Sequence, residues 1–399
     1  MKVVIVSEPG VDGVFRCVEA LVHFLLGQGM EVHLAYSDRR GSPQLLELVA
    51  TVERAGGRTV NLRTGNRPAL SDFRAFWALA RLVRQVKPDI IHSHSSKAGA
   101  LARVLPLAGA GWGAWQVYQP HAYAGMRPQR GRIDFVYDLI ERILGHFSVT
   151  VSVSIDENNY ALQQLRLPAR RMLYVPNGIS TAEFSPVSRE AKQSLRDKLG
   201  LPRDGIILGS LGRAAAQKDP ITLYRAFAKA CQRRPNLYLF HVGRGELDLE
   251  LDRLITVFGL EGRVIRYPSM ATPVHFYRAV DGFILTSLYE GMSLAVLEAL
   301  SCDLPLILSE APGNLNVLEL PLSHAWKAPI GDVSAFARMI EQWVVSCERP
   351  GKLHCNHREI AALNFERQGS LARVQQLYRD LKASRRSLPK LERLPASAH

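Results

Sequence analysis

Short apolar runs alternate with segments of helical periodicity from the first residues of the chain. Residues 3–6 are continuously apolar, which is typical of a strand buried on both faces of a parallel sheet. Residues 14–27 then carry apolar side chains at helical spacing. The alternation continues with a strand at 31–35 and a helix at 71–87, for which Ser71 or Asp72 is the expected N-cap. Later strands are predicted to start at residue 90 and to occupy 149–153 and 173–175.

The same pattern restarts in the second half of the chain. Asn177-Gly178 is a strong turn signal, and a polar helix is predicted at 188–199. Strands that alternate with helices form βαβ units and a parallel sheet. Two such series indicate an α/β protein with two doubly wound, Rossmann-like domains rather than one TIM barrel. The predicted strands of the second series are 206–210, 237–242, 264–267, 282–285 and 305–308, and its helices are 220–233, 247–258, 274–279 and 293–301.

The last part of the chain is predicted to be one amphipathic helix followed by a tail. Residues 364–383 place leucine and valine side chains on one stripe, and residues 384–399 mix charged, small and proline residues. We therefore expect a first domain at 1–176, a second at 177–363, a helix at 364–383 and a poorly packed tail at 384–399.

Charge and cysteine content indicate which partners and which cellular compartment to expect for the protein. The 399 residues include 50 basic and 37 acidic side chains, a net charge of +13, which favours an anionic partner; a solvated basic surface is the alternative. The five cysteines are scattered and form no CxxC pair, so a reduced, cytoplasmic protein is expected. The first apolar run is too short for a signal peptide, and no apolar run is long enough to predict a membrane-spanning helix.

Two loops that follow predicted strands could bind phosphate groups, because ligands bind at the carboxyl ends of parallel strands. Residues 10–13 include two glycines that let backbone amides approach a phosphate, although the spacing is not GxGxxG and a plain turn is the alternative. Gly212 and Arg213, with Lys218 five residues after the arginine, follow the strand at 206–210. Two cations suit a diphosphate, and a solvated loop is the alternative.

Two glutamates flank the predicted start of a helix after the strand at 282–285. Glu290 precedes residues 291–293, which are expected to form the first helical turn and to offer unpaired amides. Glu298 lies inside the helix. Each carboxylate could accept hydrogen bonds from two sugar hydroxyls, while a capping role for one of them is the alternative.

Histidines are the remaining candidates for chemistry. His121, in a loop after the region 115–118, could hydrogen-bond a transferring group, with a structural role as the alternative. His92 and His94 would point to one face of a strand, but further zinc ligands are not recognisable. The chain shows no GxSxG elbow and no nucleic-acid-binding motif. One more cluster lies in a polar segment expected at the surface, and metal binding is not expected there: His354, Cys355 and His357.

An arginine-rich segment precedes an amphipathic one. Arg127, Arg130 and Arg132 come before the stretch 133–147, a combination that suits an anionic membrane surface. The alternative is an ordinary helix that faces the core, because one stripe of this stretch is apolar: Ile133, Val136, Ile140 and Leu144.

Several segments, taken in order, resemble those of retaining glycosyltransferases of family 4, which have the GT-B fold. The similarity covers residues 1–381, and its most specific part matches the family's E-x7-E motif at Glu290 and Glu298. The SSKAG and PHAYAG runs are similar to the subset that acts in bacterial exopolysaccharide and O-antigen assembly. The segments are HSHSSKAGALARV (92–104), YQPHAYAG (118–125), VPNGI (175–179), GSLGRAAAQKD (209–219), HVGRGEL (241–247) and SLYEGMSLAVLEAL (287–300).

This resemblance implies an N-terminal Rossmann-like acceptor domain, a C-terminal Rossmann-like donor domain, a cleft between them and a C-terminal helix that crosses back to the first domain. It implies a hexosyltransferase that retains configuration and takes a nucleotide-sugar donor, expected to be UDP-linked with GDP-mannose as the alternative. The expected acceptor is a saccharide or lipid-linked saccharide at the inner face of the cell membrane. No metal or other cofactor is expected, because cationic side chains and amides would hold the diphosphate.

The resemblance also assigns roles to individual residues. The donor diphosphate would be held by Arg213 and Lys218 beside Gly212, and the ribose hydroxyls by Glu298. The remaining roles go to Glu290 with the amides of Gly291, Met292 and Ser293 at the donor sugar, His121 near the transferred sugar, and Gly13 and Lys97 on the acceptor side of the cleft. The chain departs from the family pattern at Met292, Asp303, Arg244 and the run Pro312-Gly313-Asn314.

Two other classes of protein fit the same features. A nucleotide-sugar 2-epimerase shares two Rossmann-like halves and would convert the donor without any acceptor. A non-catalytic sugar-nucleotide-binding subunit of a polysaccharide complex would bind the nucleotide without turnover.

Overall fold

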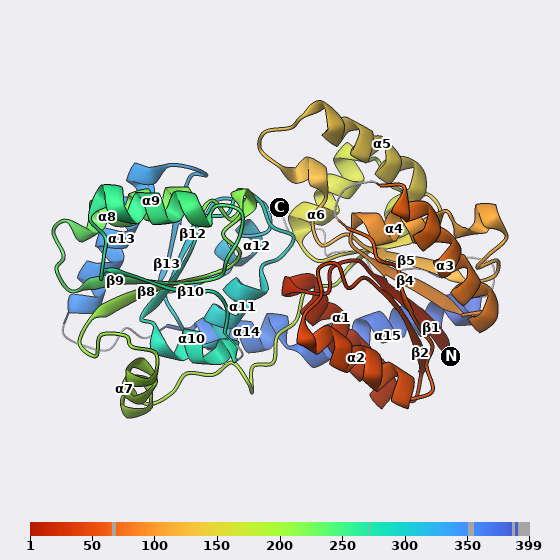
Figure 1. Cartoon of the computed structure of the whole chain (residues 1–399), viewed down its shortest axis with the longest axis horizontal. Helices are drawn as coiled ribbons and strands as arrows, with labels where there is room; N and C mark the ends of the chain where they lie inside the picture. Colours follow the sequence, from red (N-terminus) through yellow and green to blue (C-terminus); the bar gives the residue numbers. More distant parts are fainter. Residues whose placement is uncertain (66–68, 271, 350–354, 385–387, 390–399) are drawn as a thin grey trace. The chain divides into compact units, whose positions relative to one another are not determined.

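The computed structural model describes residues 1–65, 69–270, 272–349, 355–384 and 388–389. The chain divides into two compact units, Met1–Asn177 with Gln368–His399 and Gly178–Arg367 (Figure 1). Each unit is built on one parallel sheet, so the α/β class predicted from the alternating pattern is confirmed. Most of the predicted tail at 384–399 lies outside the described residues.

In the described part of the first unit, seven parallel strands form one sheet in the order β3-β2-β1-β4-β5-β6-β7. The chain leaves β1 towards β2 on one side, and it leaves β4 towards β5 on the other. This reversal is the topological switch point, where doubly wound sheets open a crevice at the carboxyl ends of the strands. The strands are β1 (Lys2–Ser7), β2 (Glu31–Tyr36), β3 (Thr59–Asn61), β4 (Ile90–His94), β5 (Trp115–Gln119), β6 (Val149–Ser152) and β7 (Met172–Tyr174).

Helices cover both faces of this sheet. Helices α1, α2 and α15 pack with Val3 and Ile5 of β1, whereas α3 and α4 pack with Val4 and Val6 on the opposite face. The continuous apolar run of β1 therefore serves both faces, as predicted. The helices are α1 (Asp12–Gly27), α2 (Pro43–Arg54), α3 (Ser71–Val86), α4 (Ser96–Arg103), α5 (Arg132–Gly145), α6 (Ile155–Asn159) and α15 (Arg367–Ser384), with the short η1 (Leu105–Ala108), η2 (Ala124–Met126), η3 (Tyr160–Gln164) and η4 (Ala169–Arg171).

The described residues of the second unit form a six-stranded parallel sheet in the order β10-β9-β8-β11-β12-β13. Its switch point lies between β8 and β11. The strands are β8 (Ile206–Leu211), β9 (Leu237–Val242), β10 (Val264–Tyr267), β11 (Gly282–Leu285), β12 (Leu306–Ser309) and β13 (Ala325–Ala328). The helices are α7 (Arg189–Lys198), η5 (Ala216–Lys218), α8 (Pro220–Cys231), α9 (Asp248–Phe258), α10 (Pro273–Ala279), α11 (Leu294–Ser301), α12 (Leu315–Leu318), α13 (Val333–Glu348) and α14 (His357–Phe365).

The C-terminal helix differs from the prediction of one helix at 364–383. Helix α14 ends at Phe365 and α15 begins at Arg367. Between them, Glu366 has an extended backbone and pairs with Ile179 in an isolated parallel bridge. Its Oε2 also accepts a hydrogen bond from Thr181 Oγ1 at 2.5 Å. A tertiary contact therefore breaks a helical pattern that looks continuous in the sequence.

The predicted cap of α3 is also wrong. The N-cap is Leu70, and no side chain there caps the helix. Asp72 lies in the first turn, where it accepts hydrogen bonds from the Ala69 amide at 3.0 Å and from Lys97 Nζ at 3.1 Å.

None of the helices in the described ranges is both long enough and apolar enough to cross a membrane.

Candidate active site

The loops after β8 and β11 hold most of the residues predicted to bind a donor. They follow the two strands that flank the switch point of the second sheet, where a ligand is expected in an open α/β sheet. The loop after β8 carries Gly212, Arg213 and Lys218, and the loop after β11 carries Glu290. Two segments about 70 residues apart in sequence are thus brought to one edge of the sheet.

Lys218 and Glu290 meet directly. Lys218 Nζ lies 2.6 Å from Glu290 Oε1, which also accepts a hydrogen bond from Ser287 Oγ at 2.6 Å. The two charged side chains are only 19% and 7% exposed. Removal of one partner from a partly buried ion pair of this kind strongly destabilises a protein. The presence of this pair at the switch point of the second sheet therefore needs an explanation.

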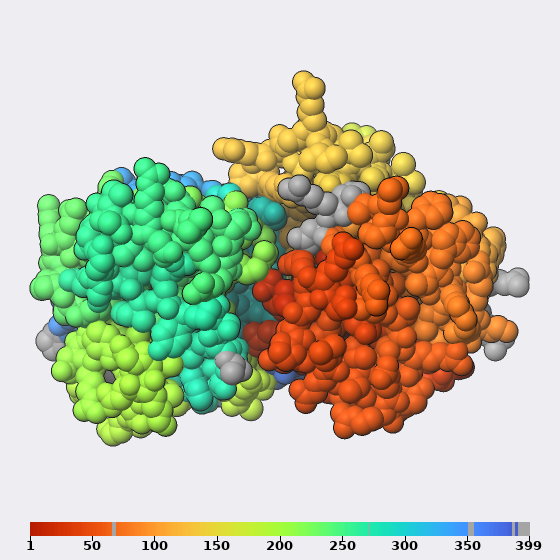
Figure 2. All heavy atoms as spheres, in the orientation of Figure 1, coloured from red at the N-terminus to blue at the C-terminus, as the bar shows by residue number. Residues whose placement is uncertain are grey.

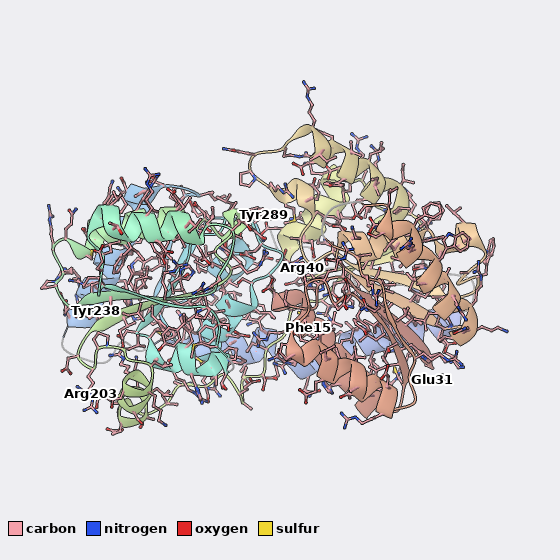
Figure 3. All side chains as sticks on the ribbon, in the orientation of Figure 1. Phe15, Glu31, Arg40, Arg203, Tyr238 and Tyr289 are labelled. Atoms are coloured by element: carbon pink, nitrogen blue, oxygen red, sulfur yellow. The ribbon has the colours of Figure 1, made fainter. Side chains whose placement is uncertain are left out.

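Hydrogen bonds between the two loops fix this pair. Thr286 Oγ1 donates to the carbonyls of Lys218 and Asp219, at 3.1 and 2.8 Å. Gln217 Nε2 donates to the carbonyl of Tyr289 at 3.0 Å, and Tyr289 is labelled in Figure 3. The backbone of both loops is therefore held in place by hydrogen bonds within the protein.

Glycine at position 243 allows the loops after β8 and β9 to touch. Gly243 has φ +137°, and a Cβ there would lie 2.0 Å from the carbonyl oxygen of Gly212. A larger residue would push away the segment that carries Arg213. No role was predicted for Gly243, although a Gly-x-Gly run directly after a strand was the available signal.

Residues 291–293 lie differently from the prediction. They precede α11 instead of forming its first turn, and Ser293 is the N-cap in extended conformation. Gly313, another residue without a predicted role, has φ +84° and supports this segment. A Cβ on it would lie 2.6 Å from the Glu290 carbonyl oxygen and 2.7 Å from that of Gly291. The departure from the family pattern at 312–314 therefore still provides a glycine where the backbone requires one.

Glu298 is fully buried on α11. Its Oε2 accepts a hydrogen bond of 2.7 Å from Tyr277 Oη on α10, a contact that sequence reasoning missed. Gly291, Met292 and Ser293 are buried as well. The roles assigned to these residues remain predictions.

The loop that carries His121 in the first unit is strained. His121 has φ +60° and Ala122 has φ +118°, a conformation that side-chain-bearing residues rarely adopt. The buried carboxylate of Glu157 holds the loop: it accepts from the Ala122 amide at 2.7 Å and from the Val153 amide at 2.6 Å. Glu157 is therefore a residue that positions His121, and it was not predicted.

Three histidines gather beside this loop. His92 and His94 point to the same face of β4, as their alternation predicted, with ring centroids 4.2 Å apart. His94 Nδ1 lies 3.0 Å from His121 Nε2, and His92 Nδ1 lies 2.5 Å from Tyr378 Oη on α15. Burial lowers the pKa of His92 to about 3 and that of His121 to about 4. These imidazoles are therefore neutral at physiological pH and act as hydrogen-bonding groups.

Glu157 should make stability depend on pH. Burial raises its pKa from the usual 4.5 to about 7, against the lowering effect of its two amide bonds. The folded state then binds more protons than the unfolded state between these values, so unfolding free energy should fall as pH rises from about 4.5 to 7, by up to about 3 kcal/mol. We expect the stability difference between wild type and Glu157→Gln to shrink over this range in denaturant titrations. The titration of the buried histidines cancels in this difference, because both proteins contain them. A difference in unfolding free energy that is constant with pH would contradict the raised pKa of Glu157.

The predicted acceptor-side residues lie at the switch point of the first sheet. Gly13 is exposed in the first turn of α1, and Lys97, the second residue of α4, is ion-paired with Asp72 at 3.1 Å. Nearby, Arg40, labelled in Figure 3, pairs with the buried Glu8 at 3.8 Å. Burial raises the pKa of Glu8, while Arg40 and Lys97 lower it.

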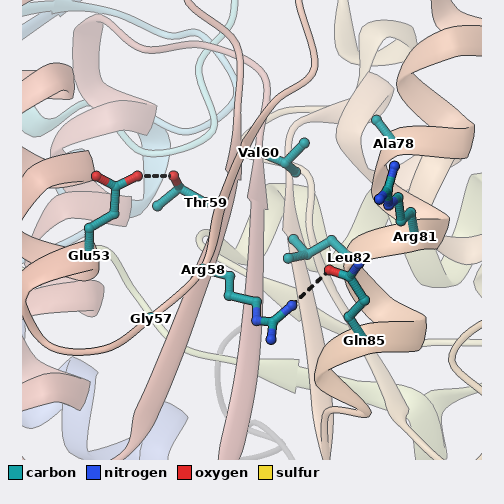
Figure 4. Close-up of a pocket in the computed structure, with 9 residues that line it drawn as sticks. All are labelled: Glu53, Gly57, Arg58, Thr59, Val60, Ala78, Arg81, Leu82 and Gln85. Carbon is teal, nitrogen blue, oxygen red and sulfur yellow. Dashed lines mark hydrogen bonds between the residues drawn. The ribbon is translucent and has the colours of Figure 1, made fainter.

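The remaining polar cluster of the sequence, around His357, and a cavity beside β3 are not part of the candidate site. His357, predicted at the surface, is fully buried, and its Nδ1 donates to the Leu304 carbonyl at 2.8 Å, because a carbonyl oxygen can only accept. His354 lies outside the described residues. A cavity of about 510 Å³ beside β3 and α3 is lined by Glu53, Arg58 and Arg81 among others (Figure 4). It includes no predicted site residue, and its own glutamate opposes the binding of an anion.

Comparison with known proteins agrees with this architecture. Residues 11–183 match the family model "Glycosyltransferase Family 4", and residues 191–359 match "Glycosyl transferases group 1". The chain is a glycosyltransferase of the family 4 type, with the GT-B fold. A UDP-Gal:alpha-D-GlcNAc-diphosphoundecaprenol alpha-1,3-galactosyltransferase of Escherichia coli is 29% identical over 273 residues, which are 67% of this chain and 69% of that protein.

Two further comparisons concern a relative and the fold. The lipopolysaccharide core biosynthesis glycosyltransferase LpsE of Rhizobium meliloti is 33% identical to this glycosyltransferase over 150 residues, 37% of this chain and 42% of LpsE. The crystal structure of HepE from Anabaena with UDP-glucose has a TM-score of 0.78 at 19% identity and covers 94% of this chain and 98% of that one. At this identity the structure shows a shared fold.

Proposed function

We propose that this glycosyltransferase moves a hexose from a UDP-hexose to a lipid-linked saccharide, with retention of configuration, in the assembly of a bacterial surface polysaccharide. The observation that carries the proposal is the Lys218–Glu290 pair at the switch point of the second sheet. The name of the Escherichia coli relative, which specifies UDP-Gal and a GlcNAc-diphosphoundecaprenol acceptor, supports the donor and acceptor classes. GDP-mannose is the alternative donor.

The diphosphate of the donor is assigned to Lys218 and Arg213. A nucleoside diphosphate carries about two negative charges, which these two cations match by charge-assisted hydrogen bonds. In the structure, Glu290 neutralises Lys218. We propose that the donor replaces this internal partner at Lys218, and that the enzyme needs no metal ion because its own cations hold the diphosphate.

The two glutamates are assigned different parts of the donor. Glu298, held by Tyr277, would accept hydrogen bonds from the ribose hydroxyls. Glu290, with the backbone at 291–293, would contact the hexose, where positive charge develops as the glycosidic bond breaks. The leaving phosphate would take the proton of the attacking acceptor hydroxyl on the same face, and the neutral imidazole of His121 would hydrogen-bond the transferred group.

A donor panel tests this function. UDP-hexoses, GDP-mannose and bare nucleotides are added separately to the full chain, and the melting temperature is measured for each. A donor that binds at about 100 times its Kd raises the unfolding free energy by about 2.7 kcal/mol. The stabilising donor is then incubated with lipid-linked saccharide diphosphates, and NMR of the product determines the anomeric configuration. Transfer with retention supports the proposal. Conversion of the donor without acceptor would identify an epimerase, and binding without turnover on any acceptor would identify a non-catalytic subunit.

A lipid-linked acceptor also places the reaction at a membrane. We propose that the enzyme works as a peripheral protein at the inner face of the cell membrane, which agrees with its excess of basic residues.

A further inference from the structure

Helix α5 carries its apolar side chains on the outside. The side chains of its outer face are between 40% and 66% exposed, although every one of them is a large hydrophobe. A surface helix of a globular protein normally has the opposite arrangement, with the apolar stripe towards the core. In Figure 1, α5 lies at the edge of the first unit, where it packs on α4 and η2, and Figure 2 shows this gold segment at the molecular surface. The outer face consists of Ile133, Phe135, Val136, Leu139, Ile140, Ile143 and, just after the helix, Phe147.

Carboxylates on the inner side of α5, two buried and one half-buried, fix the helix in this orientation. Glu141 faces inward, where it accepts hydrogen bonds from Arg103 and Tyr118, each at 2.8 Å. Asp138 accepts from Tyr160 Oη at 2.7 Å, and Asp134 from the Gly131 amide at 2.8 Å. Turning the helix over would move these carboxylates into solvent and leave the buried Arg103 without its anionic partner. The core-facing alternative from the sequence is therefore wrong, and the apolar face is a built feature.

Arginines form the rim of this face. Every exposed charged residue between positions 127 and 147 is an arginine, because Asp134 and Glu141 are buried and Asp138 is half-buried in an ion pair with Arg130. Arg127 is ion-paired with Asp134 at 3.7 Å, and the guanidinium of Arg130 lies 4.6 Å from the ring centroid of Phe135. Arg132 and Arg142 are exposed on the helix itself. An apolar face with a positive rim results.

We propose that this outer face of α5 docks on an anionic lipid surface, with Val136 and Ile143 in the acyl–headgroup boundary and the arginines at the headgroups. Apolar insertion and attraction to anionic lipid act together in such helices. A second copy of the chain fits less well, because a two-fold contact places the same patch against itself and brings arginine rims together without exposed acids to pair them. The docking rests on the proposed function only in that a lipid-linked acceptor gives it a use.

Vesicle flotation of the full chain tests the docking. Vesicles of phosphatidylcholine with about 30% phosphatidylglycerol should bind the protein at about 0.05 M salt and release most of it at about 0.5 M, because salt screens the arginines. The double variant Val136→Asn, Ile143→Asn should bind about tenfold more weakly, since two apolar side chains no longer enter the boundary. Pure phosphatidylcholine vesicles should bind the wild type weakly.

A matched variant separates docking from a general effect of polar substitutions. Leu249→Asn with Val257→Asn replaces two exposed apolar residues on α9 and should leave vesicle binding unchanged. Equal binding by the α5 variant and wild type, or no binding at low salt, would overturn the proposal. A dimer in sedimentation that the α5 variant abolishes, without vesicle binding, would assign the face to a second copy instead. Transfer to a water-soluble acceptor should be the same in all variants, so failure of the docking and failure of the proposed function give different results.

Discussion

Replacement of Glu290 by glutamine should lower kcat about 100-fold, which corresponds to about 2.7 kcal/mol of transition-state stabilisation. The glutamine would keep the shape of the side chain and could still accept the hydrogen bond from Ser287. It would lack the negative charge that faces the sugar as the glycosidic bond breaks, and contacts that tighten in the transition state change kcat rather than ground-state affinity. Nucleotide affinity should not fall, because the diphosphate then has no internal carboxylate to displace from Lys218. Steady-state kinetics and calorimetry with the bare nucleotide measure both quantities.

Two other glutamates provide the comparison for this result. Glu348→Gln removes the same charge from an exposed ion pair with Arg234, ahead of the amino end of β9, and should leave kcat and affinity unchanged. Glu298→Gln should weaken binding of donor and free nucleotide alike, because its assigned partner is the ribose, remote from the reacting carbon. Near-wild-type turnover of Glu290→Gln would show that the glutamate motif is not the site of the donor sugar.

The strands of the two sheets follow largely from patterns that are local in the sequence. Fully buried parallel strands read as continuous apolar runs, and β9, β10 and β11 have the predicted bounds. The placement of Lys218 and Glu290 after the carboxyl ends of strands follows from the same logic, because ligands bind at that edge of a parallel sheet. These features need no knowledge of which distant residues touch.

Features that depend on distant contacts were not predictable in this way. The break between α14 and α15 comes from the pairing of Glu366 with Ile179, almost 190 residues away. The inverted face of α5 depends on buried partners such as Arg103 for its carboxylates, and a hydrophobic stripe alone cannot show which side is inside. Some elements, α2 and α13 among them, were missed although their N-caps Ser42 and Asp332 accept amide hydrogen bonds as sequence rules would suggest.

Replacement of Lys218 by alanine should weaken binding of the nucleoside diphosphate about tenfold to 100-fold, and Arg213→Ala should act similarly. A hydrogen bond to a charged group contributes about 1.5–3 kcal/mol, and the diphosphate would lose one such partner in each variant. Binding of the uncharged nucleoside should barely change, since the lysine is assigned to phosphate alone. Calorimetry with UDP and uridine compares the two ligands on the same protein.

The ion pair adds a test that separates ligand binding from folding. Lys218→Ala leaves the Glu290 carboxylate partly buried without its cation, so this variant should also have a lower melting temperature than the wild type. The double variant Lys218→Ala, Glu290→Gln removes that unpaired charge and should recover stability while diphosphate affinity stays low. Lys198→Ala, at the exposed end of α7, is the control and should change neither quantity. Recovery of affinity together with stability in the double variant would mean that Lys218 supports the fold of the loop and does not hold the diphosphate.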